Sequence, residues 1–258
     1  MAFAATWLAL REPADRAARD HTLLSQAIHA AGSSPVVLDL GCGTGSTVRT
    51  LTPLLPETTQ WRLVDNDQEL LDIAATEAAS STVHLLNILD IQSLPLNGVT
   101  LVTCSALLDL VTESWLRELA TALSVPFYAA LSYNGIMRWE PELPEDQTIT
   151  EAFNEHQRRD KGLGPALGPD SAARTVEVFE SAGWHTALAP SDWSLGPESE
   201  TLHIALVEGI GQAASEAGEP GAEDWTRHRV AAAARSECLI GHSDILVTPP
   251  SEDSDEHR

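Results

Sequence analysis

Residues 36–45 constrain the fold of this chain more than any other segment. They read Val-Val-Leu-Asp-Leu-Gly-Cys-Gly-Thr-Gly, an apolar run that passes directly into three alternate glycines. A short apolar run of this kind is typical of a strand buried on both faces of a parallel sheet. Glycines let the backbone turn tightly and approach a ligand closely, because they carry no Cβ. The segment predicts a strand at 36–40, then a ligand-binding loop, then a helix.

The first half of the chain repeats this alternation of strand and helix. A helix is predicted at 12–30, a short one at 47–55 and another at 67–78 with Asp67 as its cap. Repeated strand–helix units build a parallel sheet whose right-handed crossovers place helices on both faces. We therefore predict one α/β domain with a seven-stranded, mostly parallel sheet. The expected strands are 36–40, 61–65, 83–86, 99–104, 127–133, 184–189 and 238–247.

Three segments outside this repeat are expected to serve the binding site or an interface. Residues 134–169 are rich in proline and glycine and contain a charged helical stretch, so we expect an insertion near the substrate pocket. Residues 1–32 are expected to form a helical lid, with Trp7, Arg11 and Arg19 as the side chains that close over a ligand. A further helical insertion, 196–236, precedes the last strand. The domain is expected to span 1–248, with 249–258 as a disordered acidic tail.

The charge balance excludes two classes of partner. The chain has 15 Lys and Arg against 38 Asp and Glu, a formal net charge of −23. Nucleic acids and anionic membranes are bound through basic surfaces, so neither is expected. The three cysteines form no Cys-x-x-Cys pair, and no apolar run approaches the roughly 18 residues of a membrane span. Because the histidines lie mostly alone, no metal site is expected. A soluble, cytoplasmic protein is predicted.

The glycine loop is compatible with more than one nucleotide ligand. A phosphate-binding P-loop requires a lysine after its last glycine, and the only lysine of the chain is Lys161, so that motif is excluded. A dinucleotide fingerprint would use Gly41 and Gly43, but Ser46 stands at its third glycine. The carboxylate of Asp39, two residues before the loop, would repel a pyrophosphate and attract an ammonium or sulfonium group.

With the strand, Asp39 and three alternate glycines, VVLDLGCGTG, the chain resembles the class I S-adenosylmethionine-dependent methyltransferases. The resemblance covers roughly residues 35–135 and implies their Rossmann-like fold, with an antiparallel last strand, and S-adenosylmethionine as cofactor. It implies that the loop holds the methionine end of the cofactor and that Asp65, twenty residues after Gly45, takes both ribose hydroxyls. A single carboxylate can accept two hydroxyl donors, so the chemistry agrees.

The resemblance extends to residues near the later strands. Either Asn87 or Asp90 is expected to receive the adenine amino group, and Ser105 to lie beside the methionine moiety. Cys42 is expected to pack in the loop rather than to act as a nucleophile, because no basic residue neighbours it. The full set of expected cofactor-binding residues is Asp39, Gly41, Cys42, Gly43, Gly45, Asp65, Asn66, Asn87, Asp90 and Ser105.

The candidate catalytic residues lie at the ends of strands and within the insertion 134–169. Methyl transfer is an in-line displacement in which positioning carries much of the rate, and a base is needed only where the acceptor must lose a proton. Asp109, Tyr133 and Asn134 are expected at carboxyl ends of strands, where ligands bind in open α/β sheets. His156 is a candidate general base, and Lys161 a candidate for holding an anionic group. Asp109 has a structural alternative as a helix-start carboxylate, and His156 and Lys161 have one as part of a solvated helix.

The resulting hypothesis is S-adenosylmethionine-dependent methyl transfer to a small-molecule acceptor. Two alternatives remain open: a non-catalytic binding protein of the same fold, and an NAD(P)-dependent oxidoreductase, which Ser46 and Asp39 disfavour. A homodimer contact through residues 196–236 is a further expectation. The acceptor atom, the need for a general base and the pairing of the last two strands do not follow from the sequence, since about forty residues separate those strands where a short hairpin is common.

Overall fold

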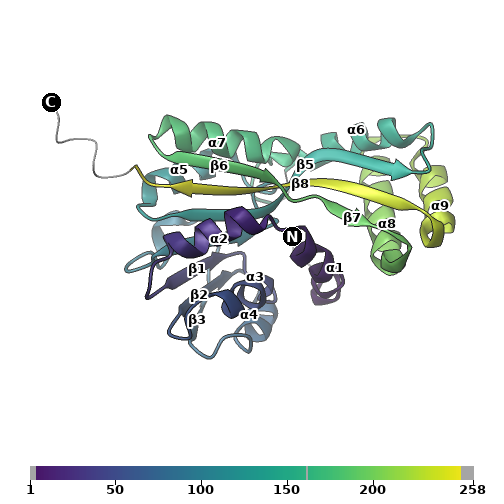
Figure 1. Cartoon of the computed structure of the whole chain (residues 1–258). Helices are drawn as coiled ribbons and strands as arrows, with labels where there is room; N and C mark the ends of the chain where they lie inside the picture. Colours follow the sequence, from purple (N-terminus) through teal and green to yellow (C-terminus); the bar gives the residue numbers. More distant parts are fainter. Residues whose placement is uncertain (1–3, 161, 251–258) are drawn as a thin grey trace.

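One eight-stranded sheet organises residues 4–160 and 162–250, which the computed structural model describes. Its order is β3-β2-β1-β4-β5-β8-β6, with the short β7 paired to β8 (Figure 1). Strands β1 to β5 are parallel, whereas β8 lies antiparallel between β5 and β6. The predicted mostly parallel sheet with an antiparallel last strand is therefore confirmed. The strands are β1 Val36–Leu40, β2 Gln60–Asp65, β3 Ser81–Leu85, β4 Leu101–Ser105, β5 Phe127–Glu140, β6 His185–Pro190, β7 Trp193–Leu195 and β8 Glu237–Thr248.

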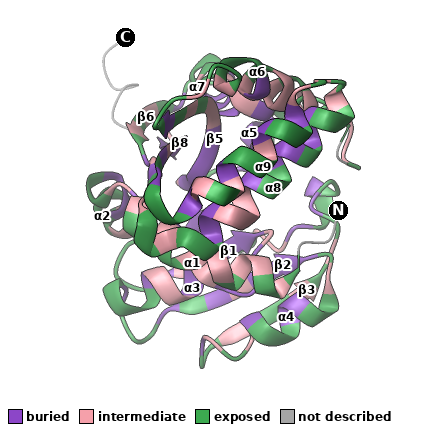
Figure 2. Cartoon of the chain, turned by 90° about the vertical axis from the view of Figure 1, so that its right-hand side faces the viewer, coloured by how far each residue is buried: buried purple, intermediate pink, exposed green. Residues whose placement is uncertain are grey.

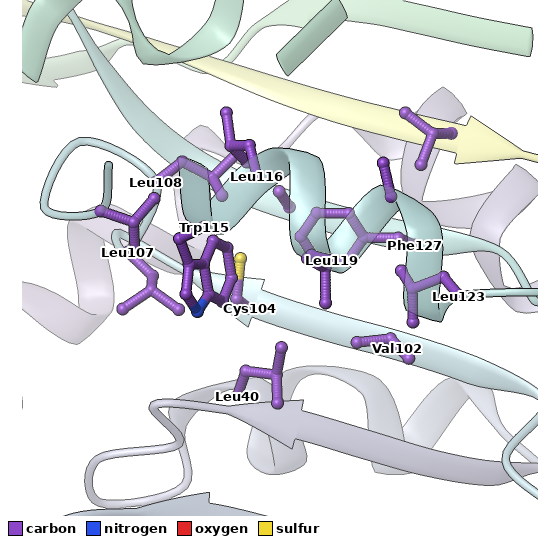
Figure 3. Packing of buried hydrophobic residues seen from close by; sticks show 14 of the residues in the cluster. Leu40, Val102, Cys104, Leu107, Leu108, Trp115, Leu116, Leu119, Leu123 and Phe127 are labelled. Carbon is purple, nitrogen blue, oxygen red and sulfur yellow. The ribbon is translucent and has the colours of Figure 1, made fainter. Parts of the chain in front are cut away.

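Helices cover both faces of this sheet because its strands alternate between two apolar clusters. In β1, Leu38 and Leu40 pack under α5 and α7, whereas Val37 faces α2, α3 and α4. Figure 3 shows Cys104 beside Trp115, and Leu40 below them, in the first cluster. This period of two is the signature of a strand buried on both sides. The helices are α1 Ala5–Ala18, α2 His21–Ala30, α3 Ser46–Leu51, α4 Gln68–Ala74, α5 Glu113–Ala122, α6 Asp146–Gln157, α7 Ser171–Ser181, α8 Glu200–Ala217 and α9 Ala222–Ala232.

The prediction of one helix over 12–30 is wrong. The chain forms two helices instead, because Arg19 and Asp20 leave the helical conformation between α1 and α2. The Asp20 side chain accepts a hydrogen bond from the Leu23 amide at 2.7 Å and so caps α2. The break is important for the site, since it turns α1 away from the direction of α2.

Strand β5 continues to Glu140, so the prediction of a strand that ends at 133 is also wrong. The inward side chains of Tyr133, Met137 and Trp139 keep the alternation of a strand past the point where glycine and proline suggested a loop. A separate apolar cluster, called the extension, consists of the second half of β5, the first half of β8, β7, α6, α8 and α9. Figure 1 shows the extension to the right of the main sheet. The short β7 raises the observed strands to eight.

A buried ion pair holds the extension together. Arg229 is 1% exposed and pairs with Asp146 through two hydrogen bonds. It also donates to the carbonyl of Pro141 at 2.8 Å and lies 5.0 Å from the ring centroid of Trp139. Asp146 accepts a further hydrogen bond from the Trp225 indole at 2.8 Å. Loss of either Arg229 or Asp146 would therefore leave the other group buried without its charged partner.

Replacing Asp146 with alanine is expected to lower the free energy of unfolding by about 3 kcal/mol, because it leaves Arg229 buried and unpaired. Urea denaturation followed by circular dichroism measures this loss. The matched control is Asp224→Ala, which removes an exposed pair with Arg227 on the helix that carries Arg229 and is expected to cost at most about 0.5 kcal/mol. Equal losses in the two variants would contradict the role of the buried pair.

Two sequence expectations fall outside the described residues: the position of Lys161 and, apart from residues 249 and 250, the acidic tail. Within the described residues, no helix combines the length and apolar character that a membrane span requires.

Candidate functional site

The loop after β1 adopts a backbone conformation that favours glycine at all three predicted positions. Gly41, Gly43 and Gly45 have φ of 63°, 53° and 84°. A Cβ at Gly41 would lie 3.3 Å from a methyl of Leu107, and one at Gly45 would lie 3.3 Å from the Cα of Ala74. The loop is therefore closely packed at these positions, and only glycine combines this backbone conformation with the lack of space for a side chain.

A cleft with a water-accessible volume of about 160 Å³ lies in front of this loop, at the carboxyl ends of β1, β2 and β4. One wall is α1, which Figure 2 shows above α3; the Glu12 carboxylate accepts a hydrogen bond from Arg49 Nε at 2.7 Å and links the two helices. This is the edge where open α/β sheets bind ligands. The lining residues are Leu8, Arg11, Asp15, Gly41, Cys42, Gly43, Thr44, Ser46, Thr47, Asp65, Asn66, Asp67, Leu70, Ile88, Ser105, Ala106, Leu107, Leu110 and Leu163.

Asp65 forms the polar wall of the cleft. Its Oδ2 accepts a hydrogen bond from the Gly43 amide at 2.9 Å, and its Oδ1 accepts one from the Asp67 amide at 3.1 Å. These bonds fix the carboxylate while leaving each oxygen with further accepting capacity. Asn66 lines the cleft beside it. The wall is thus arranged to receive hydroxyl groups.

Two buried groups of opposite charge lie next to residues that line the cleft: Asp39 precedes Gly41 by two residues, and Arg19 is bonded to Ser105. Asp39 is 1% exposed; its Oδ1 accepts a hydrogen bond from Thr103 at 2.8 Å, whereas Oδ2 has no partner among the described residues. Arg19 is 3% exposed; its Nη2 donates to Ser105 Oγ at 3.1 Å, whereas Nη1 has no partner within the same described part of the chain. Each group keeps one hydrogen-bonding atom unsatisfied beside the glycine loop.

Burial also changes the pKa values of Asp39 and Cys42. Burial raises the pKa of Asp39 to about 7, although the hydrogen bond from Thr103 and the positive charge of Arg19 partly offset this effect. Burial likewise raises the pKa of the Cys42 thiol well above its ordinary value. Cys42 is therefore held as a neutral thiol, as expected of a packing residue rather than a nucleophile.

The two adenine candidates do not line the cleft. Asn87 is exposed, and its side chain accepts a hydrogen bond from the Leu89 amide at 3.0 Å. Asp90 is exposed and accepts one from Ser93 Oγ at 2.5 Å. Both side chains thus satisfy their own turn, and Ile88 between them lines the cleft instead. The other eight expected cofactor residues lie in or directly behind the glycine loop, the β2 end and the β4 end.

The four catalytic candidates also lie outside the set of cleft-lining residues. The Tyr133 hydroxyl donates to Asn154 Oδ1 at 2.8 Å within the extension, and burial raises its pKa. Asn134 accepts a hydrogen bond from the Ile136 amide at 3.2 Å. His156 lies 2.9 Å from a carboxylate oxygen of Glu216 and connects α6 to α8. Asp109 follows the cleft residue Leu107, and its carbonyl accepts from the Gly168 amide.

The sequence prediction omitted several residues of the cleft. Asp15 on α1 and Leu163, from the loop after α6, line it without having been predicted. The four-residue spacing of Arg11 and Asp15 was a usable signal, because such a pair shares one helix face. No comparable pattern pointed to Leu163. Within the described ranges, no group of three His, Cys, Asp or Glu side chains is arranged to hold a metal ion.

Comparison with known proteins finds a family that part of the chain matches. Residues 37–125, about a third of the chain, match the sequence model of a family described as a methyltransferase domain. No curated protein sequence matches the chain. Solved structures that resemble it share little sequence with it, so they bear on the fold.

The chain resembles a geranyl diphosphate C-methyltransferase from Streptomyces coelicolor A3(2), with a TM-score of 0.52 and 12% identity over 89% of this chain and 74% of that one. That structure is a complex with Mg²⁺, geranyl-S-thiolodiphosphate and S-adenosyl-L-homocysteine. A cyclopropane synthase from Mycobacterium tuberculosis gives 0.49 at 11% identity, over 88% and 83%. A phosphoethanolamine N-methyltransferase from Haemonchus contortus gives 0.47 at 14% identity; this chain, 88% of it aligned, spans 52% of that protein. Residues 37–125 therefore match the methyltransferase domain family, and the chain has a Rossmann-like fold similar to that of S-adenosylmethionine-dependent methyltransferases.

Proposed function

We propose that this protein is an enzyme that transfers a methyl group from S-adenosylmethionine to a small-molecule acceptor. One observation carries the proposal: the unsatisfied, buried Asp39 Oδ2 and Arg19 Nη1 next to the residues that line the cleft. Burying a charge without a partner costs several kcal/mol. The amino-acid end of S-adenosylmethionine supplies an ammonium for Asp39 and a carboxylate for Arg19, so binding would satisfy both groups at once.

The rest of the cleft suits the other end of the cofactor. The accepting capacity left on Asp65 is available to the two ribose hydroxyls. Leu70 and Ile88 supply apolar surface for the adenine ring. The S-adenosyl-L-homocysteine in the geranyl diphosphate C-methyltransferase complex and the family match of residues 37–125 support the same assignment.

When bound, the cofactor supplies a methyl group already activated on a sulfonium. The chain has to hold the acceptor in line with that methyl group and keep water away. Four leucines line the cleft for this purpose: Leu8, Leu107, Leu110 and Leu163. Leu8 comes from α1 and Leu163 from the loop after α6, so these two segments together act as the cover. The net charge of −23 favours a small molecule over a nucleic acid as the acceptor.

One observation favours a second candidate, a non-catalytic protein that binds the cofactor. None of the four catalytic candidates belongs to the described cleft lining. The two functions differ in one measurement: an enzyme transfers labelled methyl groups from S-adenosylmethionine to a component of a metabolite extract, detected by mass spectrometry, and a binding protein transfers none.

Calorimetric titration with S-adenosylhomocysteine tests the shared step. Gly43→Asp introduces a side chain at a positive φ and a second negative charge beside Asp65, and Asp65→Ala removes the polar wall. Each is expected to weaken binding by at least about 100-fold, which is about 2.7 kcal/mol. Asp72→Ala, at an exposed position of α4 outside the cleft, is the matched control and is expected to bind as the parent protein does. Unaltered binding in both cleft variants would refute the proposed function.

A further inference from the structure

Arg11 and Asp15 form a fixed array on the α1 wall of the cleft. Arg11 Nε donates to Asp15 Oδ2 at 2.8 Å, and Nη2 donates to Oδ1 at 3.0 Å. The Trp193 indole of β7 donates to the same Oδ1 at 3.0 Å, and its ring centroid lies 4.9 Å from Arg11 Cζ. The side chains of Arg11 and Asp15 are only 13% and 8% exposed. The guanidinium is thus held both by a forked ion pair and by an aromatic face.

In this array the hydrogen-bond acceptors are occupied, whereas some of the donors of Arg11 are not. Both oxygens of Asp15 accept hydrogen bonds, whereas a guanidinium has five N–H donors and Asp15 takes one from Nε and one from Nη2. Nη1 has no hydrogen bond to any of the described residues. Because Arg11 lines the cleft, the array offers the cleft rigid donors rather than acceptors. Carboxylate oxygens match such a planar pair of N–H groups.

Two carboxylates are possible occupants, that of the cofactor and one on the acceptor. The buried Arg19, bonded to the cleft residue Ser105, already has an unsatisfied Nη1 for the carboxylate of the cofactor. Arg11 lies on the wall with Leu8, near Leu107 and Leu110 of the same cleft. On the basis of the proposed function, we propose that Arg11 determines specificity by binding the carboxylate of an acceptor whose remaining surface is apolar.

Titration of the protein saturated with S-adenosylhomocysteine tests this assignment. The probes are cinnamate and its neutral counterpart cinnamamide, which share an apolar body and differ in the carboxylate. The parent protein is expected to bind cinnamate at least about tenfold more tightly than cinnamamide. Arg11→Gln is expected to remove that preference while changing the affinities for cinnamamide and S-adenosylhomocysteine less than about twofold. Arg11→Lys is expected to restore part of the preference, because it keeps the charge without the fork.

The matched control is Arg16→Gln on the same helix, where Arg16 is 56% exposed and pairs with Glu12 outside the cleft. It is expected to leave the preference intact. Three results would overturn the assignment: no preference for cinnamate in the parent protein, a preference that survives in Arg11→Gln, or a large loss of S-adenosylhomocysteine affinity in Arg11→Gln. The same titrations without S-adenosylhomocysteine separate the two proposals: failure of the parent protein to bind S-adenosylhomocysteine contradicts the proposed function alone, whereas the cinnamate comparison still decides the role of Arg11.

Discussion

Replacing Arg19 with methionine is expected to weaken the binding of S-adenosylhomocysteine by about 100-fold. The Arg19 side chain is 3% exposed; it is bonded to the cleft residue Ser105, and its Nη1 is unsatisfied among the described residues. A hydrogen bond between charged groups contributes about 1.5–3 kcal/mol, and a 100-fold change in affinity corresponds to about 2.7 kcal/mol. Methionine keeps much of the length and the apolar stem of arginine, so the loss is assigned to the charge. Isothermal titration calorimetry measures it.

Ligands that lack one group at a time make this test specific. 5′-Methylthioadenosine has neither carboxylate nor ammonium, and decarboxylated S-adenosylmethionine has only the ammonium. Arg19→Met is expected to bind both of them with nearly the affinity of the parent protein. Arg16→Met, at an exposed position of α1, is the control and is expected to retain full affinity for S-adenosylhomocysteine. If Arg19→Met lost affinity equally for all three ligands, the variant would have damaged the cleft in general, and Arg19 would not be the carboxylate-binding residue.

The site is predictable from sequence only where it depends on neighbouring residues of the chain. The glycine loop, Asp39 and Asp65 could be placed because a buried parallel strand fixes which residues follow it and at which edge of the sheet they lie. The cap of α4 by Asp67 is local in the same sense, and the structure confirms it with a hydrogen bond to the Glu69 amide at 2.9 Å. The glycine loop, Asp65 and Asp67 line one face of the cleft.

The other face depends on contacts between distant segments. Tyr133 and Asn134 were selected because β5 was expected to end there, but the strand continues to Glu140 and carries Tyr133 into the extension, where it meets Asn154. Asp15 faces the cleft because Trp193, 178 residues later, donates to it. A periodicity within one helix or strand contains no information about such a partner, so this second face of the cleft could not be derived from the pattern.

Asp39→Asn is expected to weaken S-adenosylhomocysteine binding by about 100-fold at pH 7.5 and to abolish the pH dependence of binding. In the parent protein, burial raises the pKa of Asp39 to about 7. Only the carboxylate attracts the ammonium of the ligand, so affinity is expected to rise between pH 5.5 and pH 7.5, by up to about tenfold per pH unit below 7. The amino group of the ligand stays protonated over this pH range. A parent protein whose affinity is constant over that range would contradict the assignment.

The stability of the ligand-free protein distinguishes this effect from a damaged fold. The pKa of Asp39 is higher in the folded state than the ordinary value of 3.8, so between about pH 4 and pH 7 the folded chain retains a proton that the unfolded chain has lost. The parent protein therefore loses stability as pH rises through that window, by at most about 1.4 kcal/mol per pH unit from this group. The asparagine side chain of the variant does not titrate, so this loss is absent from it.

Ligand-free Asp39→Asn is thus expected to equal the parent protein in stability near pH 4 and to exceed it by up to about 4 kcal/mol at pH 7.5. Urea denaturation at a series of pH values measures the difference. A variant that folds more stably and yet binds S-adenosylhomocysteine far more weakly cannot owe its loss of affinity to unfolding. That combination would identify Asp39 as a group kept at the expense of stability in order to bind a cation, whereas lower stability of the variant at pH 7.5 would assign Asp39 a structural role.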